Sequence, residues 1–160
     1  MKVYLASDHA GFALKSALLQ HLAASGHEVE DVGAFTLDPE DDYPDFITPC
    51  AEKTVADAGS RGIVIGGSGQ GEAMAANRVK GARAALFYGE VHPPAGLDAE
   101  GNVAVDGFDI VRLARKHNDA NILSLGARFI SGETAVEAMR IFLETPFSDS
   151  PRHARRIAKF

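Results

Sequence analysis

The chain has 160 residues, of which 46% are hydrophobic and 24% are charged, and these values suit one globular domain, 1–160, with a core of its own. The formal net charge of −6 disfavours nucleic acid as the main partner. The single cysteine, Cys50, excludes an internal disulfide framework, and the lack of a long apolar run predicts neither a signal peptide nor a membrane span, so we expect a cytoplasmic protein.

Strands and helices are predicted to alternate along the chain. Short apolar runs predict strands at 2–7, 27–33, 62–67, 82–89 and 121–127, and helical patterns occur at 12–25, 47–59, 72–79, 109–117 and 132–145. In the first helix Leu14, Leu18 and Leu22 recur on one face, and Gly26 is expected to cap its end. The alternation predicts βαβ units with a parallel sheet, in which ligands bind beyond the C-terminal ends of the strands.

Two segments interrupt this alternation. The stretch 35–46 is acidic and contains prolines. It fits a solvated turn as well as a functional lid, and Tyr43 is its residue of most interest. The stretch 91–107 is rich in glycine, proline and alanine, and it predicts a long surface excursion, either a hairpin or a flap, close to the expected site.

The first and third predicted strands lead into polar or glycine-rich loops. Asp8 and His9 follow the first strand, where Asp8 alone fits a helix N-cap and a lone histidine is most often structural. The third strand runs into GGSGQG at 66–71, which lacks both the Gly-Lys-Ser/Thr of a P-loop and the spacing of a dinucleotide fingerprint. Such a loop fits a tight turn or an anion site, yet Glu72 follows it directly and would repel a phosphate.

Further candidates lie on either side of the fifth predicted strand. His117 and Asn118 come at the end of a predicted helix, where His117 alone would only complement the helix dipole. Arg128 follows the strand. No HxH, HExxH or CxxC pattern occurs and the six histidines are scattered, so no metal site is expected.

The tail, SPRHARRIAKF at 150–160, carries a local excess of positive charge. Arg152, Arg155 and Arg156 lie at helical spacing beside His153. A solvated basic face is the ordinary explanation for such a cluster. The functional alternative is capture of a phosphate, to which the two-pronged guanidinium group is suited.

Five motifs, in order along the chain, together identify a resemblance. They are SDHAGF at 7–12, DYPDF at 42–46, GGSGQGEAMAANRVKGARAAL at 66–86, HNDAN at 117–121 and RHARR at 152–156. With them the chain resembles the ribose-5-phosphate isomerase B family, which also contains galactose-6-phosphate isomerase subunits. The resemblance implies a Rossmann-like three-layer αβα sandwich with a five-stranded parallel sheet. It also implies a homodimer or tetramer with active sites shared between subunits, and no metal or other cofactor.

The same resemblance implies roles for single residues. Glu72, His117 and Ser68 are expected to be catalytic, with Glu72 as the base, His117 assisting ring opening and Ser68 in the loop whose amides hold an oxyanion. The residues expected to bind the sugar phosphate are Asp8, His9, Tyr43, Gly67, Gly69, Gly71, Asn118, Arg128, Arg152 and Arg156. Many family members carry a cysteine base at the position of Gly66. A second branch uses a glutamate directly after the loop, and this chain fits that branch.

An isomerase of this kind explains why an acid follows the glycine loop. The reaction takes a proton from the carbon next to a carbonyl and returns it to the adjacent carbon through an enediolate. Loop amides stabilise the charged oxygen, the carboxylate carries the proton, and arginines hold the phosphate at the far end of the sugar. The expected function is the interconversion of ribose 5-phosphate and ribulose 5-phosphate.

Three alternatives stay open. A related isomerase would act on allose, galactose or erythrulose phosphate, and the long 91–107 stretch leaves the preferred sugar undecided. A non-catalytic sugar-phosphate binding module would need the arginines but not Glu72. A nicotinamide-dependent oxidoreductase would use an acid such as Asp31 after the second strand, but no matching glycine pattern follows the first strand.

Overall fold

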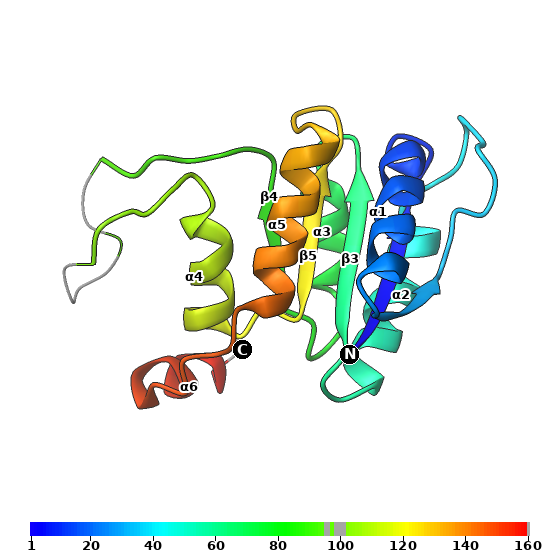
Figure 1. Ribbon diagram of the computed structural model, residues 1–160. Helices are drawn as coiled ribbons and strands as arrows, with labels where there is room; N and C mark the ends of the chain where they lie inside the picture. Colours follow the sequence, from blue (N-terminus) through cyan, green and yellow to red (C-terminus); the bar gives the residue numbers. More distant parts are fainter. Residues whose placement is uncertain (95–96, 98–101, 160) are drawn as a thin grey trace.

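The computed structural model describes residues 1–94, 97 and 102–159, and it is a three-layer αβα sandwich (Figure 1). Five parallel strands form the middle layer in the order β2-β1-β3-β5-β4. The strands are β1 (Lys2–Ser7), β2 (Glu28–Asp31), β3 (Arg61–Gly66), β4 (Ala84–Phe87) and β5 (Ile122–Gly126). The helices are α1 (Phe12–Ala24), α2 (Pro44–Ala56), α3 (Gln70–Ala76), α4 (Asp109–Asn118), α5 (Gly132–Glu144) and α6 (Pro151–Ile157). The predicted fold class and parallel sheet are confirmed.

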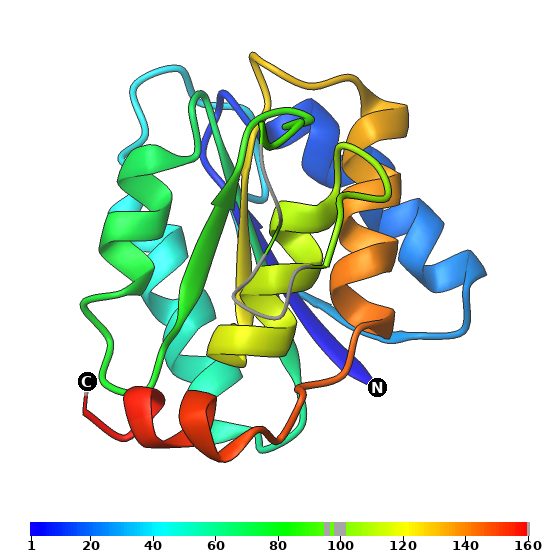
Figure 2. The same ribbon diagram turned by 90° about the vertical axis from the view of Figure 1, so that its left-hand side faces the viewer.

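Each face of the sheet has its own hydrophobic core, because neighbouring residues of a strand point to opposite faces. Val3 and Leu5 of β1 pack into the core beneath α1, α4 and α5. Tyr4 and Ala6 of the same strand pack into the second core, together with Cys50 and other residues of α2 and α3. Figure 2 shows the sheet edge-on between these two layers of helices. Among the described residues, no helix combines the length and apolar character needed to cross a membrane.

Three loops that follow neighbouring strands meet at the C-terminal edge of the sheet. Strand β3 lies between β1 and β5, with Ser7 of β1 opposite Ile65, and Gly66 opposite Gly126 of β5. From β1 the chain moves outward to β2, and it then crosses back to β3 on the other side of β1. This reversal of direction is the place where open α/β sheets bind their ligands.

Several predicted boundaries shift by a few residues. Helix α2 starts at Pro44 rather than at 47, because proline is well suited to the first turn of a helix. Helix α3 starts at Gln70, inside the glycine loop, and β2 and β4 are shorter than predicted. The C-cap of α1 is Ser25, one residue before the predicted Gly26, and Gly26 takes the left-handed position that follows the cap, with a φ of +77° and its N–H donated to Ala23 O. The helical spacing of the tail is confirmed by α6.

The segment 91–107 leaves the end of β4 and returns to the start of α4. Its two ends are joined by a hydrogen bond of 2.9 Å from the Val91 N–H to Gly107 O, as a hairpin or flap requires. Val91, Pro93 and Leu97 line a small cavity together with Leu113 of α4, so these three residues lie beside that helix. The described part contains no strand, and residues 95–96 and 98–101 of the predicted excursion lie outside the described residues.

Candidate active site

A cavity of about 410 Å³ opens at the C-terminal edge of the sheet. Its walls come from the turn after β1, the end of the loop before α2, the glycine loop between β3 and α3, and the turn after β5. The predicted site residues that line it are Asp8, His9, Tyr43, Gly67, Ser68, Gly71, Glu72 and Arg128. Residues that are far apart in the sequence thus surround one cavity.

Glu72 lies in the first turn of α3, buried against the end of β3. Its carboxylate fills the space beside the Cα of Gly66, so any side chain at position 66 would overlap it. The residue is only 4% exposed. Burial raises the pKa of Glu72 and the Asp8 carboxylate adds to this, while backbone N–H groups of Glu72 and Gly69 act in the opposite direction. A carboxyl group with a raised pKa is suited to accept and return a proton near neutral pH.

The glycine loop is held in place from β5. The Ser124 hydroxyl donates to Gly69 O at 2.7 Å, and the Arg128 N–H donates to Gly67 O at 3.0 Å. Gly69 does not line the cavity, but its φ of +75° shapes the loop as the N-cap of α3. A Cβ at this position would lie 2.9 Å from the carbonyl carbon of Leu125, so the loop requires glycine there. The result is a rigid backbone beside the cavity.

Arg128 and Tyr43 flank the glycine loop. A Cβ on Gly67 would lie 3.2 Å from Arg128 Cζ, and a Cβ on Gly71 would lie 2.8 Å from Tyr43 Cζ. The two glycines therefore let a guanidinium group and a phenol ring approach the backbone closely. A cation and a hydroxyl beside backbone amides form a setting that favours negative charge on a bound molecule.

Asp8 and His9 occupy the turn between β1 and α1. Asp8 is 6% exposed, and its Oδ1 accepts a hydrogen bond of 3.1 Å from the Gly11 N–H. The N-cap of α1 is Gly11, so the alternative that Asp8 is the N-cap is wrong, although its carboxylate does hold the turn before the helix. His9 is bonded to Asp41, which sequence reasoning missed. The acidic stretch before Tyr43 was its only signal.

Among the described residues, one cluster offers enough donor atoms to be considered as a metal site. It consists of Asp8, His9 and Asp41, whose candidate ligand atoms lie within 4.8 Å of one another. His9 Nδ1 and Asp41 Oδ1 are already bonded to each other at 2.6 Å. A cation bound through these atoms would have to break that pair. The cluster therefore fits an acid–histidine hydrogen bond better than a metal site.

The remaining predicted residues lie at the opposite end of the sheet. His117 and Asn118 end α4, and Arg152 and Arg156 lie on α6, which the two ribbon views place beyond the N-terminal ends of the strands (Figures 1 and 2). The ring centroids of His117 and His153 are 4.1 Å apart, which joins α4 to α6. Within a single chain these four residues therefore do not line the cavity that contains Glu72, and their part in the site stays a prediction. A helix that connects parallel strands runs back across the sheet and ends at its other edge.

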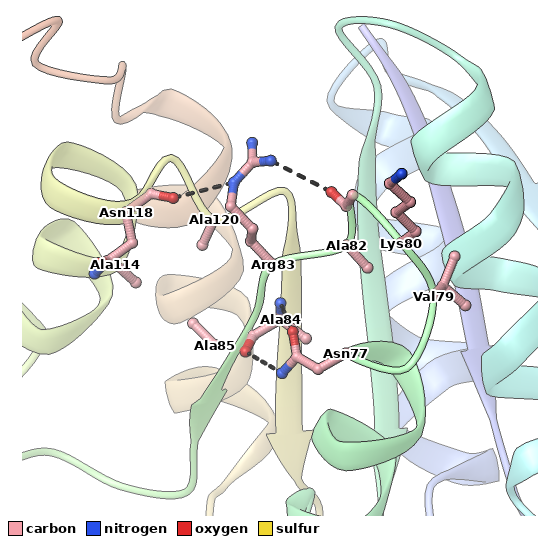
Figure 3. Close-up of a pocket in the computed structure, with 11 residues that line it drawn as sticks. Asn77, Val79, Lys80, Ala82, Arg83, Ala84, Ala85, Ala114, Asn118 and Ala120 are labelled. Atoms are coloured by element: carbon pink, nitrogen blue, oxygen red, sulfur yellow. Dashed lines mark hydrogen bonds between the residues drawn. The ribbon is translucent and has the colours of Figure 1, made fainter. Parts of the chain in front are cut away.

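Asn118 borders a second cavity, of about 650 Å³, beside the open edge of β4 (Figure 3). Ala84 and Ala85 of β4 and Ala114 of α4 contribute apolar surface to it. The Arg83 guanidinium donates from Nε to Asn118 O at 3.1 Å, as the dashed line in Figure 3 marks. None of the residues that line the first cavity borders this one.

Comparison with known proteins finds similar chains over nearly the whole length of this one. The family model described as Ribose/Galactose Isomerase matches residues 3–93 and 103–160. Ribose-5-phosphate isomerase B of Mycolicibacterium paratuberculosis is 45% identical over 157 residues, which cover 98% of this chain and 87% of that protein. The enzyme of the same name from Mycobacterium tuberculosis H37Rv is 43% identical, with 98% and 86% covered.

Solved structures show the same likeness. The structure of ribose-5-phosphate isomerase B from Mycoplasma genitalium with bound ribulose-5-phosphate matches with a TM-score of 0.84 and 35% identity, covering 99% of this chain and 92% of that one. The ribose 5-phosphate isomerase of Thermotoga maritima matches with a TM-score of 0.82 and 39% identity, covering 99% and 95%.

Proposed function

The chain belongs to the ribose/galactose isomerase family, and from this premise we infer that it interconverts ribose 5-phosphate and ribulose 5-phosphate. The observation that carries the chemistry is the Glu72 carboxylate, buried beside Gly66 at the wall of the first cavity. The relatives of this chain are enzymes of sugar metabolism, and we place this enzyme in the pentose phosphate pathway of the cytoplasm.

Glu72 is proposed to move the proton between the two carbons. Its carboxylate takes the hydrogen from C2 of the open-chain aldose as a proton, and the bonding pair forms the C1=C2 bond while the carbonyl electrons move to O1. The resulting enediolate gains a proton on O1 and loses one from O2. Glu72 then returns its proton to C1, which leaves the carbonyl at C2. The raised pKa of Glu72 suits both halves of this cycle, because the group must both accept and release the proton.

The glycine loop is proposed to stabilise the enediolate. Charge develops on a substrate oxygen when Glu72 takes its proton, and donors fixed in advance are the most effective way to stabilise such charge. Gly67, Ser68 and Gly71 of this loop line the cavity, and Arg128 adds a positive charge beside them. The hydrogen bonds to β5 keep this backbone in place.

We propose that the enzyme works as a dimer, or as a pair of dimers, with active sites shared between copies. Arg152 and Arg156 are proposed to bind the phosphate and His117 to assist ring opening, yet all three lie at the end of the molecule opposite Glu72. A second copy would supply them. Beside the open edge of β4, an exposed face carries Met74, which is 69% exposed, and a cavity of about 780 Å³, and both support a protein partner there.

A panel of phosphorylated sugars tests the function. We expect kcat/KM to be highest for ribose 5-phosphate among the phosphates of ribose, allose, galactose and erythrulose. A higher value for one of the other sugars would assign the chain to a related isomerase. Binding of these sugars without turnover of any of them would identify a binding module instead.

Replacing His117 by alanine is expected to slow turnover of the ring form by about a hundredfold, the usual contribution of a general acid or base. A four-carbon aldose phosphorylated at its last carbon cannot close a stable ring, so its slow turnover should be affected far less. The ratio of the two kcat/KM values, variant against wild type, measures this. Equal losses on both substrates would show that His117 does not act in ring opening.

Replacing Cys50 by serine is expected to leave most of the activity intact. Cys50 is fully buried in the core beneath α2, and burial raises the pKa of its thiol to about 12, so it carries no thiolate at neutral pH. Placing a hydroxyl there costs about 1–3 kcal/mol of stability. We expect a lower Tm with kcat close to that of wild type. A folded variant without activity would instead give Cys50 a role in the reaction.

A further inference from the structure

His9 is held by one oxygen of a distant carboxylate. Asp41 Oδ1 accepts a hydrogen bond from the His9 backbone N–H at 3.0 Å, and it lies 2.6 Å from His9 Nδ1. His9 belongs to the turn after β1, whereas Asp41 belongs to the loop that leads from β2 to α2. The two bonds together fix the position of the residue and the orientation of its ring.

In the His9–Asp41 pair, the carboxylate of Asp41 is buried and the imidazole ring of His9 is partly exposed. The Asp41 side chain is 8% exposed and the His9 side chain is 32% exposed. Asp41 Oδ2 is buried and has no hydrogen-bond partner among the described residues. The charge of this carboxylate is therefore directed at His9 rather than at solvent, while the His9 ring borders the first cavity.

Charged groups reach His9 from three elements. Asp41 faces it from the loop before α2, Asp8 from its own turn and Arg128 from the turn after β5. The hydrogen bond to Asp41 is the main cause that raises the pKa of His9, and the charges of Asp8 and Asp41 act in the same direction. Burial of the ring and, to a smaller extent, the charge of Arg128 oppose them. Glu72 also lines the cavity, where the Asp8 carboxylate helps to raise its pKa.

The geometry also fixes which ring nitrogen is available. When Nδ1 carries a proton and donates it to Asp41, Nε2 is the nitrogen left for a ligand. In the cationic ring Nε2 carries a proton as well, and a donor of this kind makes its strongest hydrogen bonds to anionic oxygen. A neutral ring would instead present a lone pair, which repels a phosphate oxygen.

We propose that Asp41 is a positioning residue that holds His9 as a cation with Nε2 toward the cavity, so that His9 donates a hydrogen bond to the phosphate of the substrate. This proposal rests on the proposed function, since it assumes a sugar phosphate as the ligand. Arg152 and Arg156 of a second copy and His9 of the first would then hold the same phosphate from two sides.

Replacing Asp41 by asparagine tests the proposal, because the amide keeps the shape and an accepting oxygen but removes the charge. We expect KM for ribose 5-phosphate to rise about tenfold at pH near 8, with kcat little changed, as loss of a charge-assisted hydrogen bond predicts. At pH near 6 the histidine of the variant is itself protonated, so the KM values should converge there. The direction follows from the raised pKa of His9: wild type keeps the cation to higher pH than the variant does.

Asp42 offers a matched control. It is the neighbouring carboxylate, but it is exposed, and Asp42→Asn should leave the KM profile unchanged. Asp41→Glu keeps the charge and should rescue part of the affinity at pH near 8. In a His9→Gln background, Asp41→Asn should cause no further rise in KM. A tenfold rise that is the same at both pH values, or a fall in kcat at constant KM, would overturn the proposal.

Ring nitrogen and carbon NMR shifts of His9 give a readout that needs neither turnover nor a mutant. In substrate-free wild type, the His9 pKa should lie above the ordinary histidine value, the deprotonated ring should carry its proton on Nδ1, and added inorganic phosphate should raise the pKa further. An ordinary pKa, or a proton on Nε2 in the neutral ring, would refute the role of Asp41 even if Asp41→Asn does not fold. If wild type fails to isomerise pentose phosphates, the proposed function fails while these shifts still decide the role of Asp41.

Discussion

Replacing Glu72 by glutamine is expected to lower kcat for ribose 5-phosphate by on the order of a hundredfold or more, the usual contribution of a general base. Glutamine fits the same space beside Gly66 but cannot accept the proton from C2. The binding groups stay in place, so KM should change little. Exchange of the C2 hydrogen with deuterated solvent should fall in parallel with kcat, because both depend on the same proton abstraction.

The pH dependence provides a second signature of Glu72. The base must be ionised, and because its pKa is raised, kcat of the wild type should fall on acidification at a pH above the ordinary glutamate value. This acid limb should be absent from the residual activity of Glu72→Gln. Glu52→Gln, which changes an exposed glutamate of α2, is the matched control and should behave like wild type. A Glu72→Gln variant that still exchanges the C2 hydrogen at the wild-type rate would exclude Glu72 as the base.

Two impaired variants are expected to restore each other's activity when they are mixed. Glu72→Gln lacks the base, and Arg152→Ala should raise KM about tenfold to a hundredfold by the loss of a charge-assisted contact. If each site combines Glu72 of one copy with Arg152 of another, a mixed dimer holds one site with both defects and one intact site. Random pairing then yields about a quarter of the wild-type activity at low substrate concentration.

The control for this experiment combines two residues from the same end of the molecule. Glu72 and Arg128 both line the first cavity, so mixing Glu72→Gln with Arg128→Ala should restore nothing, because every site keeps one defect. Variants are unfolded together and refolded, and the rate is compared with the sum of the separate rates. Recovery in the control pair, or none in the first pair, would refute a site shared in this way.

The fold was largely accessible from the sequence because its signals are periodic. The apolar run Val3, Tyr4, Leu5, Ala6 predicts β1, whose successive residues then pack into two different cores. The spacing of Leu18 and Leu22 gives the buried face of α1. The starts of two helices were harder to predict from the sequence, because in each a single residue sets the first turn. Proline at position 44 opens α2, and Gly69, in a left-handed conformation, opens α3 before the pattern of apolar residues begins.

The candidate site could be predicted only in part, because sequence motifs are local whereas the contacts of the site join residues that are far apart in the sequence. Residues that directly follow β1, β3 and β5 do meet, as the rule for parallel sheets predicts. Asp41 was missed because the acidic stretch before Tyr43 offers several equivalent carboxylates, and only the folded loop brings one of them to His9. The side of the molecule on which His117 lies could not be predicted, because the sequence shows its place next to β5 but not the edge of the sheet at which α4 ends.

The Glu72 carboxylate occupies the space that a side chain at position 66 would need, and this limits how the site can change in evolution. A side chain at position 66 overlaps the carboxylate of Glu72, so a chain that carries a base at both positions is crowded. On the proposed mechanism, a chain with neither residue has no base. A lineage that moves its base from one position to the other must therefore cross an unfit intermediate or make both changes at once. The choice between the two positions is then inherited as a unit, and descendants of this chain should keep glycine at 66 for as long as they keep the acid at 72.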